Sequence, residues 1–216
     1  MAVGPAQATL LLGVAILLTA LYLQTESFVG PQIRAIALQS LLLGGLLTVL
    51  AAEQGSLVLA ILAGLTVGIR ALLLPYTLTR QAAAFRLPER ELRAGRRVRG
   101  HALAAVLLAV VGGGLYLEVI GPAFGHPDGV IPFLLLLEGL LLMASRSNAL
   151  VRVIAYLEEE NAVVLLGALM AAGFPILVES VVLLDLFGVV LTAGFLSLHR
   201  TATGVPEEGF VEELTG

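Results

Sequence analysis

The sequence of 216 residues contains no cysteine and only three histidines, His101, His126 and His199. A chain without cysteine can hold no disulfide, no thiolate zinc site and no iron-sulfur cluster of its own. The histidines all lie outside the middles of the hydrophobic runs, which argues against haem or a histidine metal site. We therefore expect no cofactor on this chain, so that any redox chemistry would reside on a partner protein.

Charged residues are also scarce. They make up 13% of the chain, whereas 58% of its residues are hydrophobic and the mean hydropathy is +1.00, more apolar than a soluble core of this size could bury. Several hydrophobic runs approach or exceed the roughly 18 residues that a helix needs to cross about 30 Å of hydrocarbon. The strands of a barrel would alternate and be about half as long. The composition predicts an all-α, polytopic bundle of membrane helices.

The hydrophobic runs predict seven transmembrane helices, at residues 2–23, 33–52, 56–76, 101–120, 131–145, 150–172 and 174–198. The first run lacks the basic region and the cleavage site of a signal peptide, so we expect it to be a retained helix. Residues 24–32, with Gly30 and Pro31, are predicted to form a loop. The short turn at 53–55 should join the second and third helices into a hairpin.

The extended polar stretch at residues 80–99 carries seven Arg and two Glu, with Pro88 as an expected helix start. It divides the chain into an N-terminal three-helix part, residues 1–79, and a C-terminal four-helix part, residues 100–200. An acidic tail, residues 201–216, follows. Because membrane spans flank the basic linker, we interpret it as a topology signal at the lipid surface and not as a nucleic-acid site.

The arginines determine the expected orientation, since arginine-rich loops remain in the cytoplasm. With the N-terminus outside, the arginines near helix ends fall on the cytoplasmic side: Arg34, those of the 80–99 linker, Arg146, Arg152 and Arg200. The outer turns then carry acidic residues or histidine, namely Glu53, Glu118, His126 and Asp128. The predicted topology is N-out and C-in.

Three consecutive carboxylates, Glu158, Glu159 and Glu160, interrupt the sixth hydrophobic run. If that helix began only after them, its remaining residues would cover roughly 21 Å, well short of the hydrocarbon thickness. A start near Leu150 places Glu158 about 12 Å inside the cytoplasmic end. The alternative is that the start of the helix is unwound and the carboxylates are solvated at the membrane interface.

Neighbouring residues of a helix are turned by about 100°, so the three glutamates cannot all face one pocket, and at least two should face protein. Glu158 shares a face with Asn161, three residues on. Glu159 and Glu160 point back towards Arg152, which would give them an entry from the cytoplasm.

Two further helices carry carboxylates at membrane depth. Asp185 lies near the middle of the seventh span, and Glu179 is roughly 9 Å nearer the outer surface on another face. Glu138 lies near the middle of the fifth span. An ionisable group in mid-membrane costs a few kcal/mol unless it is paired, hydrated or protonated, so each of them is a candidate functional residue.

Positive charge is scarce within the predicted spans. Arg70, five residues before Pro75, is the best candidate for an intramembrane cation, and the proline should kink its helix. The alternative is that Arg70 extends to the cytoplasmic headgroups. Because carboxylates outnumber cations, some of them must be protonated, and groups in that state can carry protons.

No motif for covalent chemistry accompanies these acids. The sequence has no Ser-His-Asp arrangement, HExxH zinc motif or Walker loop. Its glycine clusters, such as 112–114, are typical of close helix contacts in membranes. We therefore expect no enzymatic activity on this chain.

Five stretches carry a family resemblance: SRSNALVRVIAYLEEENAVVLLGAL at 145–169, FPILVESVVLLDLFGVVL at 174–191, LHRT at 198–201, IALQSLLL at 36–43 and IRALLLP at 69–75. Together they resemble the hydrogenase-4 component E family, the membrane subunits of group 4 nickel-iron hydrogenase and formate hydrogenlyase complexes. The C-terminal helices of that family, here residues 131–200, are similar to the K subunit of complex I and to the C subunit of multisubunit Na+/H+ antiporters.

The resemblance to the K subunit implies a turn asparagine at Asn148 and a glutamate-bearing helix with a second asparagine at Asn161. The K-subunit glutamates would fall at Leu157 and Leu186, each next to a carboxylate of this chain. The resemblance thus implies a carboxylate on each of two adjacent helices and leaves open which acid carries protons. Arg70 would occupy the basic position that the family has before the proline.

The resemblance further implies a non-catalytic subunit of a redox-driven, proton-translocating complex in the prokaryotic cytoplasmic membrane. Expected partners are antiporter-like membrane subunits, a complex I H-like membrane subunit, and a peripheral hydrogenase arm that holds the nickel-iron and iron-sulfur centres. Two alternatives remain open: a structural scaffold subunit, and a subunit of a multisubunit Na+/H+ antiporter. Without an obvious inverted duplication, a standalone transporter has weaker support.

Overall fold

The computed structural model describes residues 4–84, 96–124, 129–170 and 188, and within these ranges the chain is almost wholly helical. In chain order the helices are α1 (Pro5–Thr25), α2 (Val29–Gln54), α3 (Leu57–Leu65), the π-helix η1 (Thr66–Leu73), α4 (Leu74–Ala84), α5 (Arg96–Leu115), the π-helix η2 (Tyr116–Ile120), α6 (Gly121–Phe124), α7 (Val130–Ser145) and α8 (Ala149–Met170). The predicted all-α class is confirmed.

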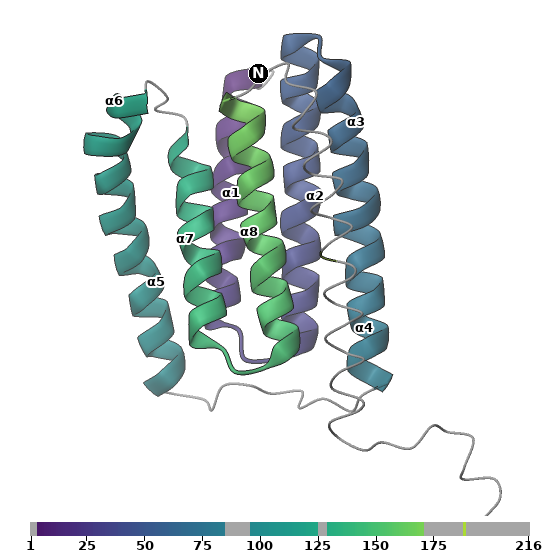
Figure 1. The fold of residues 1–216 in the computed structure, drawn as a ribbon, viewed down its shortest axis with the longest axis vertical. Helices are drawn as coiled ribbons and strands as arrows, with labels where there is room; N and C mark the ends of the chain where they lie inside the picture. The colour runs from purple at the N-terminus through teal and green to yellow at the C-terminus, as the bar shows by residue number, and fades with distance from the viewer. Residues whose placement is uncertain (1–3, 85–95, 125–128, 171–187, 189–216) are drawn as a thin grey trace, which may run out of the picture.

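The helices pack side by side as rods that alternate in direction (Figure 1). α3, η1 and α4 follow one another without a break and form one rod, and α5, η2 and α6 form another. Four helical stretches of the described part are long and apolar enough to cross a membrane: Pro5–Thr25, Val29–Gln54, Leu57–Arg80 and Val98–Ala123. The chain therefore has the helices of a membrane-embedded protein.

Two more helices complete the described bundle. α7 is apolar but has only 16 residues, whereas α8 has 22 residues and carries the three glutamates. At 1.5 Å per residue α8 is about 33 Å long, enough to span the hydrocarbon. The predicted seventh span, 174–198, lies outside the described residues apart from Gly188. The total of seven spans therefore stays a prediction.

Among the side chains that the structure describes, the arginines other than Arg70 gather at one end of the bundle: Arg34, Arg80, Arg99, Arg146 and Arg152. At this end α1 is joined to α2 and α7 to α8, while the N-terminus and the α2–α3 turn lie at the other (Figure 1). The positive-inside rule expects this distribution of an N-out chain. The orientation itself stays a prediction.

The predicted turn between the second and third helices is confirmed. α2 ends at Gln54, and Gly55 follows in the left-handed conformation (φ 61°), which glycine adopts without a steric cost. The hydroxyl of Ser56 then accepts a hydrogen bond from the N–H of Leu59 (3.3 Å) and caps the start of α3. The hairpin brings η1 alongside α2.

The predicted loop at residues 24–32 is wrong. α1 continues to Thr25 and α2 already begins at Val29, so the connection is much shorter. Gly30 and Pro31 lie in the first turn of α2. Backbone N–H groups of a first turn have no partner within the helix, so a proline is tolerated there and does not mark a loop.

Two helices extend beyond the spans predicted from hydropathy. The third span, expected at 56–76, continues as helix to Ala84, and the fourth, expected at 101–120, begins at Arg96 and runs on to Phe124. Hydropathy marks where a chain leaves the hydrocarbon, whereas a helix can continue into the interface, where its polar side chains are solvated.

The core of the bundle consists of two hydrophobic clusters. The first lies in the half with the N-terminus, and its buried members include Ile16, Leu43, Leu47, Leu62, Leu135 and Leu165. The second lies in the half with the arginines, and its buried members include Ile33, Ile36, Leu74, Leu142, Ile154 and Leu157. α2, α7, α8 and the rod of α3, η1 and α4 each pass from one cluster to the other, so each contributes to both halves.

Candidate functional site

A layer of buried polar side chains separates the two hydrophobic clusters. On α2 it lies between Ile36 of one cluster and Leu43 of the other, and on α8 between Leu157 and Ala162. η1 and α7 contribute at the same level, so the layer crosses the bundle. We call this set the polar layer, and its members are Gln39, Ser40, Thr66, Arg70, Glu138, Glu158, Glu160 and Asn161.

The three glutamates of α8 lie in regular helix. α8 is helical from Ala149 on, which places Glu158 about 13 Å from its start, so the alternative of an unwound start is wrong. Glu158 is 0% and Glu160 1% exposed, whereas Glu159 is partly exposed. The prediction that at least two of these acids face protein is confirmed.

A glycine lets α7 approach α8 closely at the level of these acids. A Cβ atom on Gly139 would lie 2.8 Å from the Cγ atom of Glu159 and 3.3 Å from the carbonyl oxygen of Ala155. Small residues at such points allow helix backbones to come together in a membrane. The neighbouring Glu138, midway along α7 as predicted, is buried at this contact.

On the η1 side of the layer, five of the polar residues form a connected set. The guanidinium of Arg70 forms an ion pair with Glu160 (Nη2 to Oε2, 3.4 Å) and donates a hydrogen bond to Oδ1 of Asn161 (3.1 Å). The Asn161 amide donates in turn to Oε1 of Gln39 (3.0 Å) and to the hydroxyl of Ser40 (3.1 Å). We call these five residues the paired half of the polar layer.

Arg70 lies in an unusual stretch of helix. Arg70 is only 2% exposed, so the alternative in which its side chain extends to the lipid headgroups is wrong. The surrounding turn is a π-helix, in which the N–H of Leu74 bonds to the carbonyl of Ile69. In a regular α-helix the ring of Pro75 would collide with the carbonyl four residues back. The proline that should kink this helix is thus preceded by a wide turn that includes Arg70.

On the α7 side of the layer, the described residues place no cation beside the carboxylates, and only the side chains of Gln24 and Gln39 approach them. Within the described residues, no oxygen of the Glu138 or Glu158 carboxylate makes a hydrogen bond of ordinary geometry. Gln39 approaches the Glu158 carboxylate, while Glu138 and Glu159 lie near enough to repel its negative charge. Buried carboxylates without a counter-charge cannot all stay ionised, because burying an unpaired charge costs several kcal/mol. We call Glu138 and Glu158, together with the partly exposed Glu159 beside them, the unpaired half.

Comparison with known proteins assigns the chain to no family. No family model, curated protein or solved structure matches it. The resemblance to the hydrogenase-4 component E family therefore stays a prediction. What the polar layer does must be argued from its own side chains.

Arg152 lies in the first turn of α8, where its Nε–H donates to the carbonyl of Arg146 (2.9 Å). Eight residues of helix separate Arg152 from Glu160 by about 12 Å, and Glu160 pairs with Arg70. The predicted entry past Arg152 to Glu159 and Glu160 stays a prediction.

The sequence does not predict that Gln24 and Arg146 are buried. Gln24, expected in a loop, lies in α1, and its Nε2 donates to the backbone carbonyl of Glu138 (2.7 Å). Arg146, expected only as a topology marker, is buried and donates to the carbonyls of Leu23 (3.3 Å) and Gln24 (2.6 Å). A cation at the C-terminal end of α1 stabilises the last carbonyl groups of that helix. Both residues fix α1 against α7.

The remaining predicted acids, Asp185 and Glu179, lie outside the described residues. Gly188, three residues after Asp185, is described. A Cβ atom at Gly188 would lie 3.2 Å from the ring of Tyr156 and 3.3 Å from Oε1 of Glu160. Gly188 therefore contacts α8 at the level of the polar layer.

The candidate site is a set of neighbouring acids. The described part of the chain has no group of three or more His, Cys, Asp or Glu residues that could hold a metal ion. The unpaired half instead brings neighbouring acids from two helices together, beside the Gln39 amide of α2. The acids can hold a proton between them and pass it on, because a carboxyl group is an acceptor when ionised and a donor when protonated.

Proposed function

We propose that this chain is a non-catalytic membrane subunit of a redox-driven, proton-translocating complex, related to group 4 nickel-iron hydrogenases, formate hydrogenlyases and complex I. The observation that carries the proposal is the unpaired half of the polar layer, where carboxylates of α7 and α8 meet without a cation among the described residues. Acids at such depth are costly, and in membrane proteins they typically belong to ion pathways and proton relays.

Glu158 is the central proton carrier in this proposal. It is fully buried and approaches both Glu138 of α7 and Gln39 of α2. Glu158 would take up a proton on one side and release it on the other, and mutual repulsion between the acids would keep the number of charges low. Asp185 and Glu179 would extend the route on the helix expected at 174–198.

The paired half would control the charge state of Glu158. Arg70 is held by Glu160 and Asn161, which belong to the same helix as Glu158. A nearby guanidinium favours the ionised form of an acid. A movement that takes Arg70 away from α8 would lead Glu158 to bind a proton, and its return would lead Glu158 to release it.

The proposal includes the expected surroundings of the chain. The partners would be antiporter-like membrane subunits, a complex I H-like membrane subunit and a peripheral arm with nickel-iron and iron-sulfur centres. The chain would lie in the prokaryotic cytoplasmic membrane with seven spans, N-out and C-in. The arginines at one end of the bundle support this orientation.

Neutralising the acids in the assembled complex tests the proposal. Glu158→Gln and Glu138→Gln should preserve electron transfer but lower the number of protons translocated per electron, because a glutamine side chain cannot take up and release a proton as a carboxyl group does. Proton movement during turnover is measured in membrane vesicles. Glu53→Gln, in the exposed α2–α3 turn, is the control. Unchanged proton stoichiometry in Glu158→Gln, Glu138→Gln and Glu159→Gln would rule out the proposal.

The paired half supports a second candidate, a purely structural protein that keeps the neighbouring subunits in place. Its ion pair and hydrogen bonds form a connected network of the kind that fixes one packing of a bundle. A scaffold predicts that the three Glu→Gln variants pump normally, whereas Arg70→Met prevents assembly of the complex. The two candidates therefore differ in which half of the layer matters.

A further inference from the structure

The partly exposed Glu159 marks a docking surface on the bundle. We propose that the face of α7 and α8 around Glu159 binds a transmembrane helix of a partner subunit, and that this helix presents a lysine or arginine to the Glu159 carboxylate. The inference rests on the proposed function in one respect, that the chain works as part of a membrane complex. It adds where a partner binds and what chemistry the partner must bring.

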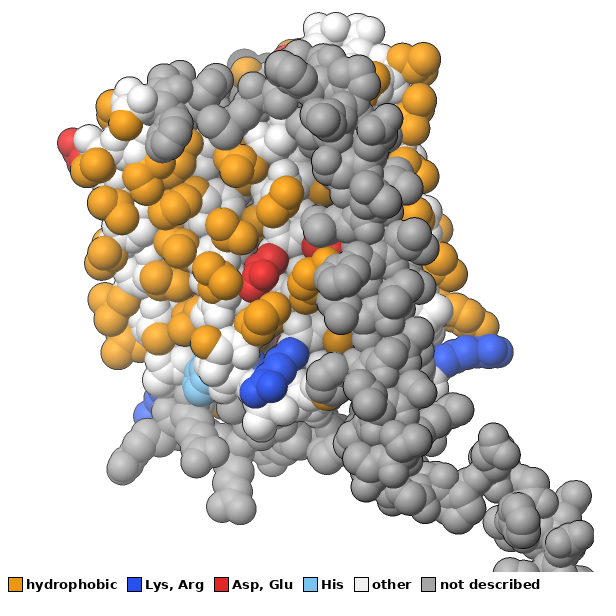
Figure 2. All heavy atoms as spheres, viewed as in Figure 1, with side chains coloured by type: hydrophobic (Ala, Val, Ile, Leu, Met, Phe, Trp, Pro, Cys, Tyr) orange, Lys and Arg blue, Asp and Glu red, His pale blue; other side chains and the backbone are white. Residues whose placement is uncertain are grey.

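Glu159 lies at mid-membrane depth on an apolar surface. It is ten residues from the start of α8, about 15 Å along the helix axis. Its exposed neighbours are apolar, with Leu140 48% and Val163 46% exposed. Figure 2 shows an acidic side chain at mid-height among hydrophobic ones in the region of α7 and α8. A carboxylate in contact with lipid at this depth is costly, so such residues almost always face protein or water.

The described part of the chain offers Glu159 no cation. Arg70 is engaged by Glu160 and Asn161, and the sequence contains no lysine at all. The other described arginines lie towards the ends of their helices, at Arg34, Arg80, Arg99, Arg146 and Arg152. None of the described residues therefore supplies a counter-charge for Glu159, and we infer that a partner chain brings it.

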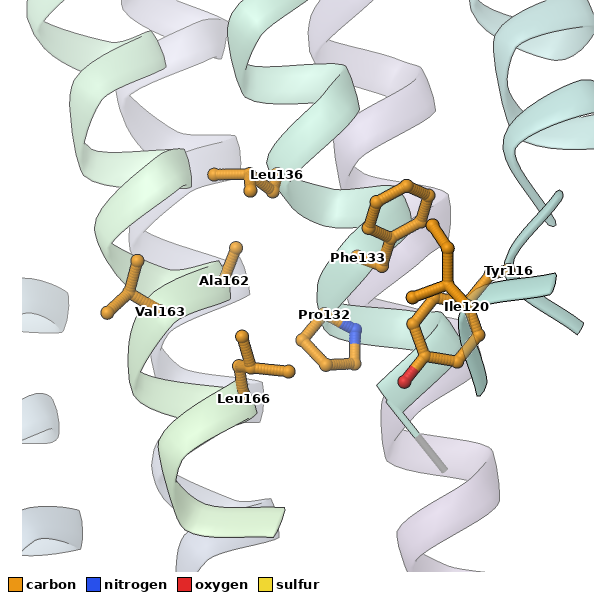
Figure 3. Close-up of a pocket in the computed structure, with 8 residues that line it drawn as sticks. All are labelled: Tyr116, Ile120, Pro132, Phe133, Leu136, Ala162, Val163 and Leu166. Atoms are coloured by element: carbon orange, nitrogen blue, oxygen red, sulfur yellow. The ribbon is translucent and has the colours of Figure 1, made fainter. Parts of the chain in front are cut away.

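An apolar groove adjoins Glu159 and gives the partner helix a place to pack. It has a volume of about 250 Å³ and lies between η2, α7 and α8. Figure 3 shows side chains of the three helices around it, with Tyr116 and Ile120 on one side and Val163 and Leu166 on the other. Val163 is one helical turn beyond Glu159, so the groove and the carboxylate form one continuous surface. A large apolar side chain of a neighbouring helix fits such a groove, and an adjacent cation would complete the contact.

The exposed face of α5 differs from the face around Glu159, because near its middle it is purely apolar. Val110 is 67% exposed and lies fourteen residues into α5, as Val163 does in α8. Gly112 faces α7, since a Cβ atom there would meet Leu137. Two residues of helix turn the chain by about 200°, so Val110 points away from α7. We assign this face to lipid, which makes Val110 a matched control for Val163.

The absence of cysteine from the chain allows a direct test in native membranes. Val163→Cys, Leu140→Cys and the control Val110→Cys are each made in the full complex and labelled with a benzophenone maleimide, and adducts are identified by mass spectrometry after illumination. We expect the first two to form an adduct with one partner protein, at a peptide that contains lysine or arginine, and the control to form lipid adducts. Adding Glu159→Lys to Val163→Cys should lower the protein adduct by about tenfold or more, because like charges repel.

Lipid adducts alone at 140 and 163 would overturn the proposal, as would an adduct between two copies of this chain or an adduct peptide without a cation. If Glu159→Lys prevents folding, Glu159→Gln takes its place, and an undiminished adduct with that variant would also count against the ion pair. Proton stoichiometry is measured separately on the same membranes. A partner adduct combined with normal proton movement in the Glu→Gln variants would reject the proposed function while leaving the docking surface in place.

Discussion

The paired and unpaired halves of the polar layer lie at the same level of the bundle and share α8, yet their charges are compensated differently. In the paired half, Arg70 lies against Glu160, and Asn161 links this pair to α2. In the unpaired half, the Glu138 and Glu158 carboxylates make no hydrogen bond of ordinary geometry within the described residues, although the Gln24 and Gln39 side chains approach them. One helix thus carries an ion pair on one side and uncompensated acids on the other.

This difference separates a contribution to stability from a contribution to function. Removing one partner of a buried ion pair is strongly destabilising, because the other charge remains without compensation. A buried acid without a partner already weakens the fold, so removing it relieves a cost. Substitutions in the two halves should therefore change the free energy of unfolding in opposite directions.

The largest effect is expected in the paired half. Arg70→Met leaves Glu160 without its cation and takes a donor from Asn161, so it should lower the free energy of unfolding by about 3–5 kcal/mol. Chemical unfolding of the purified protein in detergent measures the change. Arg80→Met, at an exposed position, should change it by less than about 1 kcal/mol. Equal losses at the two positions would break the comparison.

A smaller effect of the opposite sign is expected in the unpaired half. Glu158→Met replaces a buried acid with an apolar side chain of similar length and should raise the free energy of unfolding by about 1–3 kcal/mol. The same unfolding experiment measures it, with Glu160→Met as a control that should destabilise because it strands Arg70. If both variants destabilise equally, Glu158 has a compensating partner and the two halves do not differ.

The contact between α7 and α8 can be tested without changing any charge. Gly139→Ala places a methyl group against Glu159 and the backbone of Ala155, so it should destabilise by about 1–3 kcal/mol through overpacking. Gly45→Ala, where a Cβ atom meets nothing within 4 Å, should be neutral or slightly stabilising. Thermal unfolding in detergent measures both variants. A neutral Gly139→Ala would indicate that the helices around the unpaired half are loosely packed.

The smallest effect concerns Glu26, a carboxylate in the α1–α2 turn that has the donors which the unpaired half lacks. Burial raises its pKa, but hydrogen bonds from the Tyr22 hydroxyl and from the N–H groups of Phe28 and Ser27, together with the charge of Arg146, lower the pKa below its ordinary value. A lowered pKa in the folded state means that Glu26 stabilises the fold above its unfolded pKa and loses this contribution as the pH falls through the folded pKa.

Glu26→Gln should therefore flatten the acid limb of the stability curve, as measured by unfolding between neutral and acidic pH. Glu53→Gln, a change at an exposed carboxylate, is the control and should leave that limb as it is. An unchanged acid limb in Glu26→Gln would mean that the turn does not hold this carboxylate in its ionised form.

The start of α8 can be predicted from the length that a helix needs to cross the membrane. A helix that starts after Glu160 cannot cross the hydrocarbon, so the acids must lie within the span, and the helix does begin at Ala149. Gln39 and Ser40 also leave a signal, as a polar pair within an apolar run. The sequence does not show that this pair contacts Asn161, because a polar pair on one helix could face any of several other helices.

Sequence patterns do not predict the ion pair between Arg70 and Glu160. Arg70 and Glu160 are far apart along the chain, and helical periodicity gives the face of each side chain but not which helix lies opposite. The sequence also places Gln24 in a loop, whereas it lies in a helix and is buried. Pro31 suggests that loop, because a proline in the first turn of a helix looks the same in sequence as a proline in a loop.

The two hydrophobic clusters on either side of the polar layer have an electrical consequence. A charge that moves from α7 towards η1 within the layer stays at nearly constant depth, so the voltage across the membrane performs little work on it. Because the two clusters are apolar, they keep a moving charge within the layer, where it travels parallel to the membrane plane. Transfer along the layer would then respond to the state of neighbouring charges and remain nearly indifferent to whether the cell is energised.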